Sequence, residues 1–364
     1  MLFIRAPGRI CLFGEHQDYL GFPTISAAID RYIFITGTLS ASMSDSISFH
    51  VSQPDIGQLD PLILKIPPED QLLKYETNRD YFRSGINIAR SNGVEWHDSW
   101  AVTLTGNIPI SAGASSSSAL IIAWLTFLFH AGNQEISPEM RANLGYQAEV
   151  LEFNEAGGQM DHFTSSIGGF LYNESSPVFI STSIKQNIDG LILADSGIKK
   201  NTVENLKMIK SLSLSSFKHI SEIKPDFNQF STTIEEVKPY LESLSQDEQR
   251  ILVGQLENRN ITQKAMHLLN RYDLDSQTLG NLLLEHHEIL SKKIGISVPK
   301  IDEMVNLAIQ KGAFGAKING SGFGGTMFAY APNNREEIVQ AFLDEGYDCY
   351  AVEISKGAEV VSRS

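Results

Sequence analysis

Residues 101–131 read AVTLTGNIPISAGASSSSALIIAWLTFLFHA, which predicts a strand, a loop of small residues and a helix in that order. We expect the strand over Ala101–Leu104 and the end of the apolar helix at Gly132. Between them lies the serine loop, Ser111–Ser118, which would bring backbone N–H groups and the positive end of the helix dipole to one point. That arrangement suits a phosphate, and serine hydroxyls could also reach Mg²⁺. By itself the stretch is equally compatible with a flexible serine linker, and it lacks the G-x-x-x-x-G-K-[ST] pattern of the ordinary P-loop.

Composition narrows the class of protein. The 364 residues are 42% hydrophobic and 20% charged, which is enough for two globular domains, and the net charge of -14 argues against nucleic-acid and anionic-membrane partners. The only cysteines are Cys11 and Cys349, so we expect a reducing compartment, by default the cytoplasm. We predict neither a leader nor a membrane span, because the apolar run Ala119–Ala131 is shorter than the roughly 20 residues that a span needs.

The rest of the chain alternates strand and helix patterns. We expect a helix from the N-cap Ser137 to about Phe153, with Glu149 near its end, and mainly helices over 197–290, with a serine-rich loop at 211–216. A turn-rich stretch is expected over Ala6–Pro23. The remaining predicted elements are strands Leu2–Ile4, Tyr32–Leu39, Gly169–Tyr172, Leu191–Ala194, Phe314–Ile318 and Thr326–Tyr330, and a helix around Ile301–Ala308 that ends at Gly312. The pattern is α+β, with two domains that meet near residue 175.

Two further segments carry polar or glycine-rich chemistry. The first segment, Pro7–Tyr19, reads PGRICLFGEHQDY and combines a cation, two carboxylates and an imidazole; fixed carboxylates are good acceptors for polyol hydroxyls. The glycine loop, Gly320–Gly325, lies between two apolar strands and implies close backbone approach or positive φ angles. On spacing alone, the first segment could be a solvated charged turn and the glycine loop a plain hairpin connection.

Together and in this order, the three segments resemble the motifs of the GHMP kinase superfamily, which includes galactokinase, homoserine kinase, mevalonate kinase and phosphomevalonate kinase. Pro7-Gly8-Arg9 followed by Gly14-Glu15-His16-Gln17-Asp18-Tyr19 resembles the galactokinase N-terminal signature. The resemblance implies a ribosomal-protein-S5-like N-terminal domain over residues 1–175 and a ferredoxin-like C-terminal domain over 176–364, with ATP and substrate in the cleft between them. It also implies a monomer or a homodimer.

The resemblance assigns roles by position. Arg9 and Asp161 would be catalytic, with Asp161 orienting the acceptor hydroxyl and finally taking its proton. Mg²⁺ would be held by Ser116 and by Glu149, which precedes Asp161 by the twelve positions typical of galactokinases; a buried structural glutamate is the alternative at position 149. Sugar hydroxyls would be bound by Glu15, His16, Asp18 and Asp161. ATP phosphates would be bound by Gly113, Ser115, Ser116, Ser117, Gly322 and Gly324.

The implied function is an ATP- and Mg²⁺-dependent kinase of carbohydrate metabolism that phosphorylates a monosaccharide, with the anomeric C1 hydroxyl as the expected acceptor. The sequence departs from the galactokinase pattern at Cys11, Phe13, Ser111, Ala114 and Ser118, and residues 195–202 resemble mevalonate kinases as well. Alternatives are therefore a kinase of mevalonate, a uronic acid or a heptose phosphate, and a catalytically silent sugar-sensing regulator. Glu15 and Asp18 disfavour an anionic acceptor, and no catalytic position is lost as a silent regulator would predict.

Overall fold

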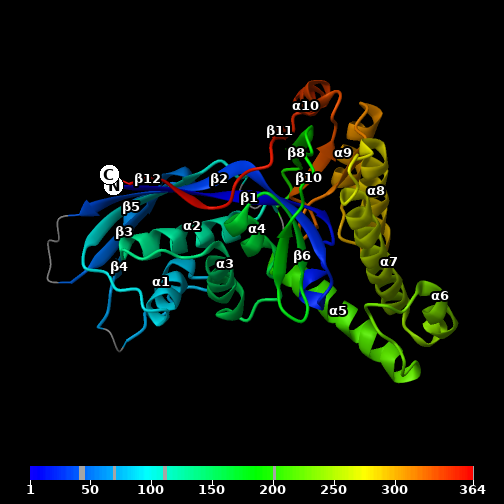
Figure 1. Ribbon diagram of the computed structural model, residues 1–364, viewed down its shortest axis with the longest axis horizontal. Coiled ribbons are helices and arrows are strands. Elements are labelled where there is room, and N and C mark those ends of the chain that lie inside the picture. The colour runs from blue at the N-terminus through cyan, green and yellow to red at the C-terminus, as the bar shows by residue number, and fades with distance from the viewer. Residues whose placement is uncertain (41–45, 69–70, 110–112, 200–201, 364) are drawn as a thin grey trace.

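The larger of two sheets carries the N-terminal half of the chain. The computed structural model describes residues 1–40, 46–68, 71–109, 113–199 and 202–363 (Figure 1). Within these residues the larger sheet contains β1 (Leu2–Phe13), β2 (Thr24–Ser40), β3 (Ser48–Gln53), β4 (Gln58–Lys65), β5 (Ser99–Gly106), β6 (Phe170–Glu174), β7 (Ile180–Ser183) and β12 (Glu359–Arg363). Its order is β12-β1-β2-β5-β3-β4, with β6 beside β2 and β7 beside β6. Strands β3 and β5 are parallel, whereas β1 and β2 form a long antiparallel pair.

The smaller sheet belongs to the C-terminal half. It contains β8 (Leu191–Asp195), β9 (Gly315–Ile318), β10 (Thr326–Tyr330) and β11 (Asp348–Val352), all antiparallel, in the order β11-β8-β10-β9. Helices separate β8 from β9, and α10 (Arg335–Asp344) separates β10 from β11. This is the order of a ferredoxin-like β-α-β-β-α-β unit, and it confirms the expected C-terminal fold.

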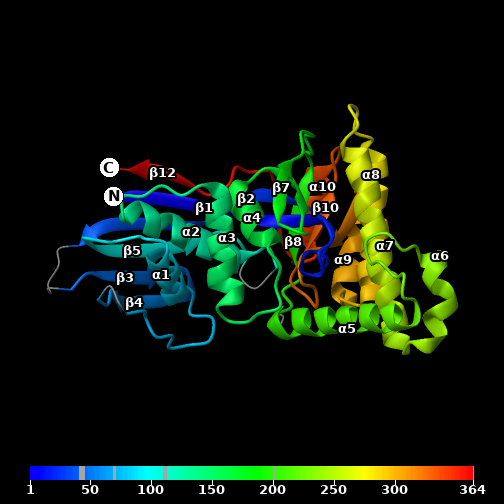
Figure 2. The same cartoon turned by 60° about the horizontal axis from the view of Figure 1, so that its bottom comes forward.

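Helices cover one face of the larger sheet and flank the smaller one (Figure 1). On the larger sheet lie α1 (Tyr81–Ser91), α2 (Ser116–Ala131), α3 (Pro138–Tyr146) and α4 (Met160–Ile167). In the C-terminal half lie α5 (Thr202–Ile223), α6 (Ile234–Val237), α7 (Gln246–Leu269), α8 (Ser276–Glu288) and α9 (Pro299–Gln310). Shorter helical turns are η1 (Asp18–Leu20), η2 (Pro54–Ile56), η3 (Gln147–Leu151), η4 (Lys238–Ser243) and η5 (Ile289–Ile294). Figure 2 shows α5 running along the lower edge toward α7.

Helix α2 lies at the centre of the N-terminal half. It is apolar on all sides, as the sequence SSSALIIAWLTFLFHA shows, and a helix of this kind must be covered on all sides. It packs against α1, α3, α4 and the strands β1 and β2. Gly132 is its C-cap, as expected, and Ser115 is its N-cap in a left-handed conformation at φ 63°. The serine loop is therefore fixed to the most deeply buried helix of this half.

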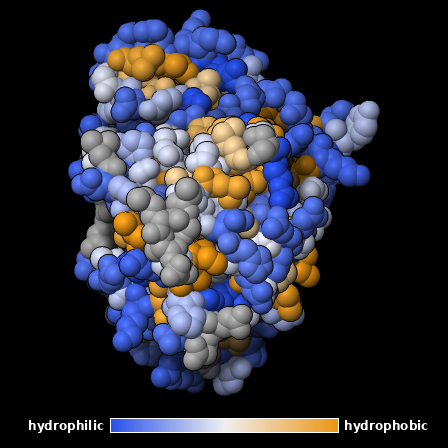
Figure 3. All heavy atoms as spheres, turned by 90° about the vertical axis from the view of Figure 1, so that its left-hand side faces the viewer, coloured by the Kyte–Doolittle hydropathy of each residue, from blue (hydrophilic) through white to orange (hydrophobic). Residues whose placement is uncertain are grey.

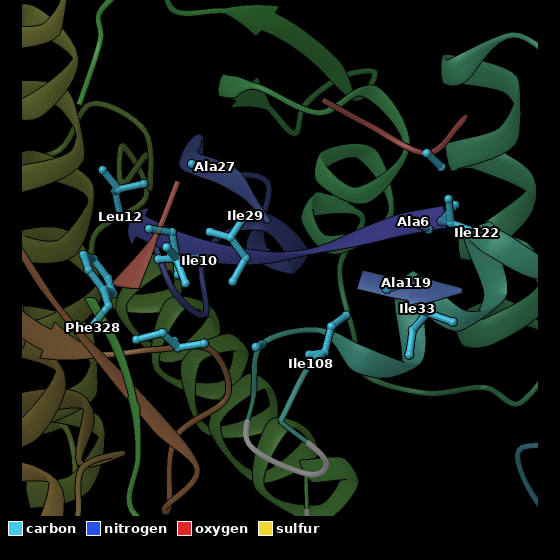
Figure 4. Packing of buried hydrophobic residues seen from close by; sticks show 14 of the residues in the cluster. Ala6, Ile10, Leu12, Ala27, Ile29, Ile33, Ile108, Ala119, Ile122 and Phe328 are labelled. Atoms are coloured by element: carbon cyan, nitrogen blue, oxygen red, sulfur yellow. The ribbon is translucent and has the colours of Figure 1, made fainter. Parts of the chain in front are cut away.

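Strand β1 connects the cores of the two halves. Figure 4 shows Ala6 of β1 beside Ile122 of α2, whereas Leu12, near the other end of β1, lies on the side of Phe328 in β10. These side chains belong to one continuous apolar cluster. The polar residues that follow Phe13 consequently emerge where the two halves meet.

The end of the chain returns to the N-terminal half. Beyond the expected boundary at residue 175, β7 pairs with β6, and β12 pairs with β1, for example through Leu2 and Arg363. The two termini accordingly lie next to each other in Figure 1. Strands from the range 176–364 therefore complete the larger sheet, so that the ranges 1–175 and 176–364 do not separate the two sheets. The boundary near residue 175 stays a prediction.

The predicted secondary structure of the first segment is wrong in part. The short strand Leu2–Ile4 continues through Phe13, and turns begin only at Gly14. Pro7 interrupts the hydrogen-bond ladder, but the register with β2 shifts between Pro7 and Arg9, and such a bulge accommodates a proline within a strand. The bulge also lets the Arg9 N–H donate to the Ala114 carbonyl at 3.1 Å.

Two other local predictions differ from the structure. The serines expected to form a loop at 211–216 lie inside α5, where Ser213 Oγ donates to the Ile209 carbonyl and Ser216 Oγ to the Ser213 carbonyl. These bonds satisfy the hydroxyls within the helix, so the serines do not break it. Residues Met160–Ile167 form α4, a helix that the periodicity did not reveal because it is only 8 residues long. Asp161 stands in its first turn.

None of the helices in the described residues combines the length and the apolar character that a membrane span requires. The end of the molecule shown in Figure 3 carries apolar residues in small groups between hydrophilic ones.

Candidate active site

A cavity of about 670 Å³ lies where the two halves meet. Its walls come from the first segment, the serine loop, the π-helical turn η3, the start of α4 and the glycine loop. The residues predicted for the site that line it are Arg9, Glu15, His16, Asp18, Gly113, Ser115, Ser116, Ser117, Glu149 and Asp161. Segments far apart in the sequence are thus brought to one place.

An ion pair between Arg9 and Asp161 lines the cavity. Arg9 Nε donates to Asp161 Oδ1 at 2.6 Å and Nη2 to Oδ2 at 2.7 Å, in the bidentate geometry that is strongest for these groups. The Arg9 side chain is 5% exposed and that of Asp161 28%, so the carboxylate faces the cavity. Burial raises the pKa of the Asp161 carboxyl, but the ion pair outweighs burial and holds this pKa below the ordinary aspartate value. Asp161 is therefore an ionised acceptor at neutral pH.

The serine loop provides an anion site beside this pair. Ser116 and Ser117 are the first residues of α2, whose leading N–H groups have no acceptor within the helix. Gly113, at φ 82°, accepts Arg9 Nη1 at its carbonyl oxygen, at 2.6 Å. The helix dipole and the Arg9 charge thus favour the same anion. Ser111, where the sequence departs from the galactokinase pattern, lies outside the described residues.

Glu149 lies in the π-helical turn η3 and is almost completely buried. Its Oε2 is 2.8 Å from His162 Nε2. Burial raises the pKa of Glu149, but His162 and the nearby serine hydroxyls outweigh burial, so this pKa lies below the ordinary glutamate value. An ionised carboxylate can only accept, so His162 Nε2 carries the proton and donates it.

The oxygen donors on this wall fit a magnesium ion that ATP brings with it. Glu149 and Ser116 offer one carboxylate and one hydroxyl, and Mg²⁺ is usually held by one or two protein oxygens together with phosphate oxygens and water. No group of three or more His, Cys, Asp or Glu side chains is placed to hold a metal in the described part of the chain. The protein donors thus fit a metal that arrives bound to phosphates.

The polar residues of the first segment line the same cavity as the ion pair. Asp18 Oδ2 accepts the Met160 N–H at 3.1 Å and so caps α4, next to Asp161. His16 is held at φ 62° in the left-handed region; its Nδ1 is 2.6 Å from Tyr19 Oη and its Nε2 3.2 Å from the Ser321 carbonyl. Because that carbonyl can only accept, Nε2 donates and Nδ1 accepts from Tyr19. Strain at a non-glycine residue in a cavity is typical of a functional position.

Glu15 lies deeper than the first segment alone suggests. Its side chain is 1% exposed, and Oε1 pairs with the ammonium of Lys317, which is itself fully buried. Oε2 has no hydrogen-bond partner among the described residues. Burial raises the pKa of Glu15, and Lys317 opposes that rise. Oε2 is buried as well and lies 3.7 Å from His286 Nδ1, so Glu15 has one oxygen bound to Lys317 and one buried oxygen without a hydrogen bond in the described part of the chain.

The glycine loop reaches the cavity at its beginning only. Gly320 and Ser321 line it, whereas Gly322 and Gly324, expected to bind phosphate, do not. A Cβ on Gly322 would lie 2.5 Å from the Ile296 carbonyl oxygen, and one on Gly324 would lie 2.7 Å from Ile198 Cγ2. In this structure these two glycines therefore serve close packing, and a role in ATP binding stays a prediction.

Sequence reasoning missed several residues of the site. Lys317 and Asn319 contact the first segment and the serine loop without lining the cavity, whereas Gly158 and the Arg79–Glu155 ion pair lie on its wall. A lone lysine inside the apolar strand 314–318 was the available signal, because a buried charge needs a partner.

Comparison with known families gives a consistent result. Three family models match the chain. The model of the galactokinase galactose-binding signature matches residues 2–38, that of the GHMP kinases N terminal domain matches 79–169, and that of the GHMP kinases C terminal matches 265–349. Among curated proteins, mevalonate kinase of Thermococcus onnurineus is 26% identical, covering 94% of this chain and 92% of its own length. Galactokinase of Pasteurella multocida is also 26% identical, covering 99% and 94%.

Solved structures share the fold. Lactococcus lactis galactokinase complexed with galactose superposes with a TM-score of 0.84 at 18% identity, covering 99% of this chain and 95% of that one. Methanococcus jannaschii mevalonate kinase gives a TM-score of 0.72 at 19% identity, covering 97% and 98%. At these identities the likeness establishes the architecture alone.

Proposed function

The chain belongs to the GHMP kinases, a family of ATP-dependent phosphotransferases, and from this premise we propose that it phosphorylates a hydroxyl of a neutral monosaccharide, the anomeric C1 hydroxyl in particular. The observation that carries the proposal is the Arg9–Asp161 pair, which lies between an anion site at a helix N-terminus and a polar segment that matches a galactose-binding signature. We further propose that it works in the cytoplasm, consistent with two free cysteines, as a monomer or a homodimer.

The proposed reaction is one phosphoryl transfer. The acceptor oxygen bonds to the γ-phosphorus, the bond from that phosphorus to the β–γ bridging oxygen breaks, and the acceptor proton passes to the Asp161 carboxylate. Such a transition state places negative charge on the phosphoryl oxygens, so positioning and cationic groups provide most of the catalysis. We assign that task to Arg9 and to the N–H groups of Ser116 and Ser117, which line the cavity at the start of α2.

Glu149 and Ser116 are the proposed protein ligands of magnesium. Mg²⁺ bound with ATP would offset the negative charge of the phosphate oxygens. His162 Nε2 donates to Glu149 and holds its carboxylate. The other ring nitrogen, Nδ1, is buried and has no hydrogen-bond partner within the described residues. The carboxylate is thus oriented before the nucleotide arrives.

The charges on the acceptor side favour a neutral substrate. Lys317 balances Glu15 and Arg9 balances Asp161, which leaves Asp18 as an unbalanced carboxylate. Burial raises the pKa of Asp18, and the hydrogen bond that the Met160 N–H donates to it opposes that rise. Sugar hydroxyls would find acceptors in Asp18 and Glu15, which both line the cavity, whereas an anionic acceptor would meet a carboxylate.

A second candidate is an acidic acceptor such as mevalonate. Six mevalonate kinases that are 26% or 27% identical support it, and so does Lys199, an exposed cation that lines the same cavity. A silent sugar sensor has no such support, because Arg9, Ser116, Glu149 and Asp161 all line the cavity.

The first test is ADP release from Mg·ATP against a panel of acceptors. The panel contains galactose, glucose, mannose, fucose, arabinose, galacturonate, glucuronate, mannoheptose 7-phosphate, mevalonate and homoserine. We expect one neutral sugar to give the highest kcat/KM. Turnover of mevalonate or another anionic acceptor alone would support a kinase but refute the neutral-sugar substrate. No turnover of any acceptor in the panel would favour the sugar-sensing regulator.

Gly158→Ala should impair acceptor binding by displacing Asp18. An added Cβ would lie 1.9 Å from Asp18 Oδ2, so the carboxylate must move. We expect the acceptor KM to rise about tenfold, the effect of losing roughly one hydrogen bond to a charged group, and the ATP KM to stay within about twofold. Steady-state kinetics with each substrate varied in turn provides the measurement.

The neighbouring glycine supplies the control for this variant. A Cβ on Gly157 would meet only Val150 Cγ2 at 3.4 Å, which is ordinary contact, so Gly157→Ala should change the acceptor KM by less than about twofold. Equal KM values for both variants would remove Asp18 from the acceptor site.

A further inference from the structure

The strand that leads into the glycine loop directs two buried polar side chains toward the first segment. Lys317 and Asn319 stand two positions apart at the end of β9 and are both fully buried. Residues two apart in an extended chain point to the same side, which here is the side of the first segment. Buried polar groups are costly unless they are hydrogen-bonded, so their partners indicate what they do.

Lys317 is bound to the first segment by two of its three donors. Its ammonium donates to Glu15 Oε1, to the Cys11 carbonyl at 3.0 Å and to the Ile318 carbonyl at 2.9 Å. An ammonium has three donors, and all three are used. Glu15 Oε1 is thereby fixed, and with it the carboxylate of a residue that lines the cavity; Oε2 is buried, 3.7 Å from His286 Nδ1.

Asn319 joins the first segment to the serine loop. Its Oδ1 accepts the Cys11 N–H at 3.0 Å, and its Nδ2 donates to the Gly113 carbonyl at 3.2 Å and to Thr326 Oγ1 at 3.3 Å. The Gly113 carbonyl also accepts Arg9 Nη1. Asn319 and Arg9 therefore hold the same peptide group, just before the N-terminus of α2.

We propose that β9 is a positioning strand with two separate tasks, in which Lys317 orients Glu15 toward the acceptor and Asn319 fixes the serine loop for the nucleotide phosphates. Neither side chain touches the reacting atoms, so each acts through its partner. The proposal rests on the kinase function above and adds positioning residues to it.

The two contacts predict separable kinetic effects. Without Lys317, Glu15 would keep a buried carboxylate without a counter-charge and would lose its fixed orientation, while the serine loop would keep its contacts. Without Asn319, the Gly113 peptide would lose one of its two donors, while Glu15 would keep Lys317. A general loss of folding would instead alter both substrates alike.

The experiment compares Lys317→Met, Lys317→Arg and Asn319→Ala in the full chain. We expect Lys317→Met to raise the acceptor KM about tenfold or more, with the ATP KM within about twofold, and Lys317→Arg to recover most of the loss because it keeps a cation. Asn319→Ala should raise the ATP KM about tenfold and leave the acceptor KM within about twofold. Glu15→Gln should reproduce Lys317→Met, and the double variant should be no worse than either single one.

Matched controls separate these effects from packing. Lys311→Met is the same change at an exposed lysine just before β9, and Thr326→Val removes the other partner of Asn319 Nδ2 with little change in shape. Both should leave the two KM values within about twofold. Should Lys317→Met not fold, Glu15→Gln tests the same link, and Asn319→Ser is the milder change at the other position.

Three results decide the matter. A selective rise in each KM supports the proposal; equal rises in both KM values, or lower melting temperatures with unchanged KM values, overturn it. Calorimetric binding of a non-hydrolysable ATP analogue provides a measurement that does not depend on turnover. If the wild-type protein turns over no acceptor, the proposed function fails. In that case, a Kd of the ATP analogue for Asn319→Ala within twofold of the wild-type value would also refute the role of the positioning strand.

Discussion

Asp161→Asn is expected to lower kcat by about 10³-fold or more, to the limit of detection, with the Kd of a non-hydrolysable ATP analogue unchanged within about threefold. A positioned general base contributes about 10²- to 10⁴-fold, and asparagine can orient a hydroxyl but cannot take its proton. The side chain shape is kept, and Arg9 can still donate to the amide oxygen. Steady-state kinetics and calorimetry on the same preparation measure the two quantities.

The control for this variant is Asp98→Asn, the same change at an exposed position outside the cavity, which should leave kcat unchanged. Near-normal kcat in Asp161→Asn would remove Asp161 from the chemistry. Equal losses of kcat and of analogue binding would instead point to a collapsed site, and melting temperatures distinguish the two.

Arg9→Met is expected to have the second largest effect, a loss of about 10³-fold in kcat/KM together with a loss of stability. Arginine cations at a transferring phosphoryl group contribute about 10³- to 10⁵-fold in other phosphotransferases. Removal of one partner of a buried ion pair costs about 3–5 kcal/mol; we expect the lower end, about 3 kcal/mol, because Asp161 keeps 28% of its side-chain exposure. Chemical denaturation and steady-state kinetics provide the two measurements.

Arg9→Lys separates charge from geometry. It keeps a cation but loses the paired Nε and Nη2 contacts to Asp161, so its kcat/KM should lie between those of wild type and Arg9→Met. The double variant Arg9→Met, Asp161→Asn should be more stable than Arg9→Met alone, because no unpaired carboxylate remains. A double variant that is less stable than both single ones would contradict the ion-pair account.

The elements that position the site were predictable where one local rule acts alone. The apolar helix after the serine loop, its end at Gly132 and the N-cap of α3 at Ser137 all follow from local sequence. The ferredoxin-like fold of the C-terminal half was also expected, because the three segments resemble the motifs of a known family.

The contacts that complete the site could not be predicted in the same way. The continuation of β1 past Pro7 depends on a bulge opposite β2, and helix α4 is too short for a periodic signal. The pairing of Glu15 with Lys317 joins residues 302 positions apart, so only the folded chain reveals it. Glu15, which was expected to bind sugar hydroxyls, lies in a buried ion pair with Lys317, and its role as a sugar ligand stays a prediction.

The most direct test of the central claim is phosphorus NMR of the product formed from Mg·ATP and the best acceptor of the panel. Transfer to the anomeric hydroxyl of a neutral sugar predicts a new phosphomonoester signal split by the single proton on C1, with one equivalent of ADP and no inorganic phosphate. A monoester at another carbon, a phosphorylated anionic acceptor, or ADP formed together with inorganic phosphate would contradict the account.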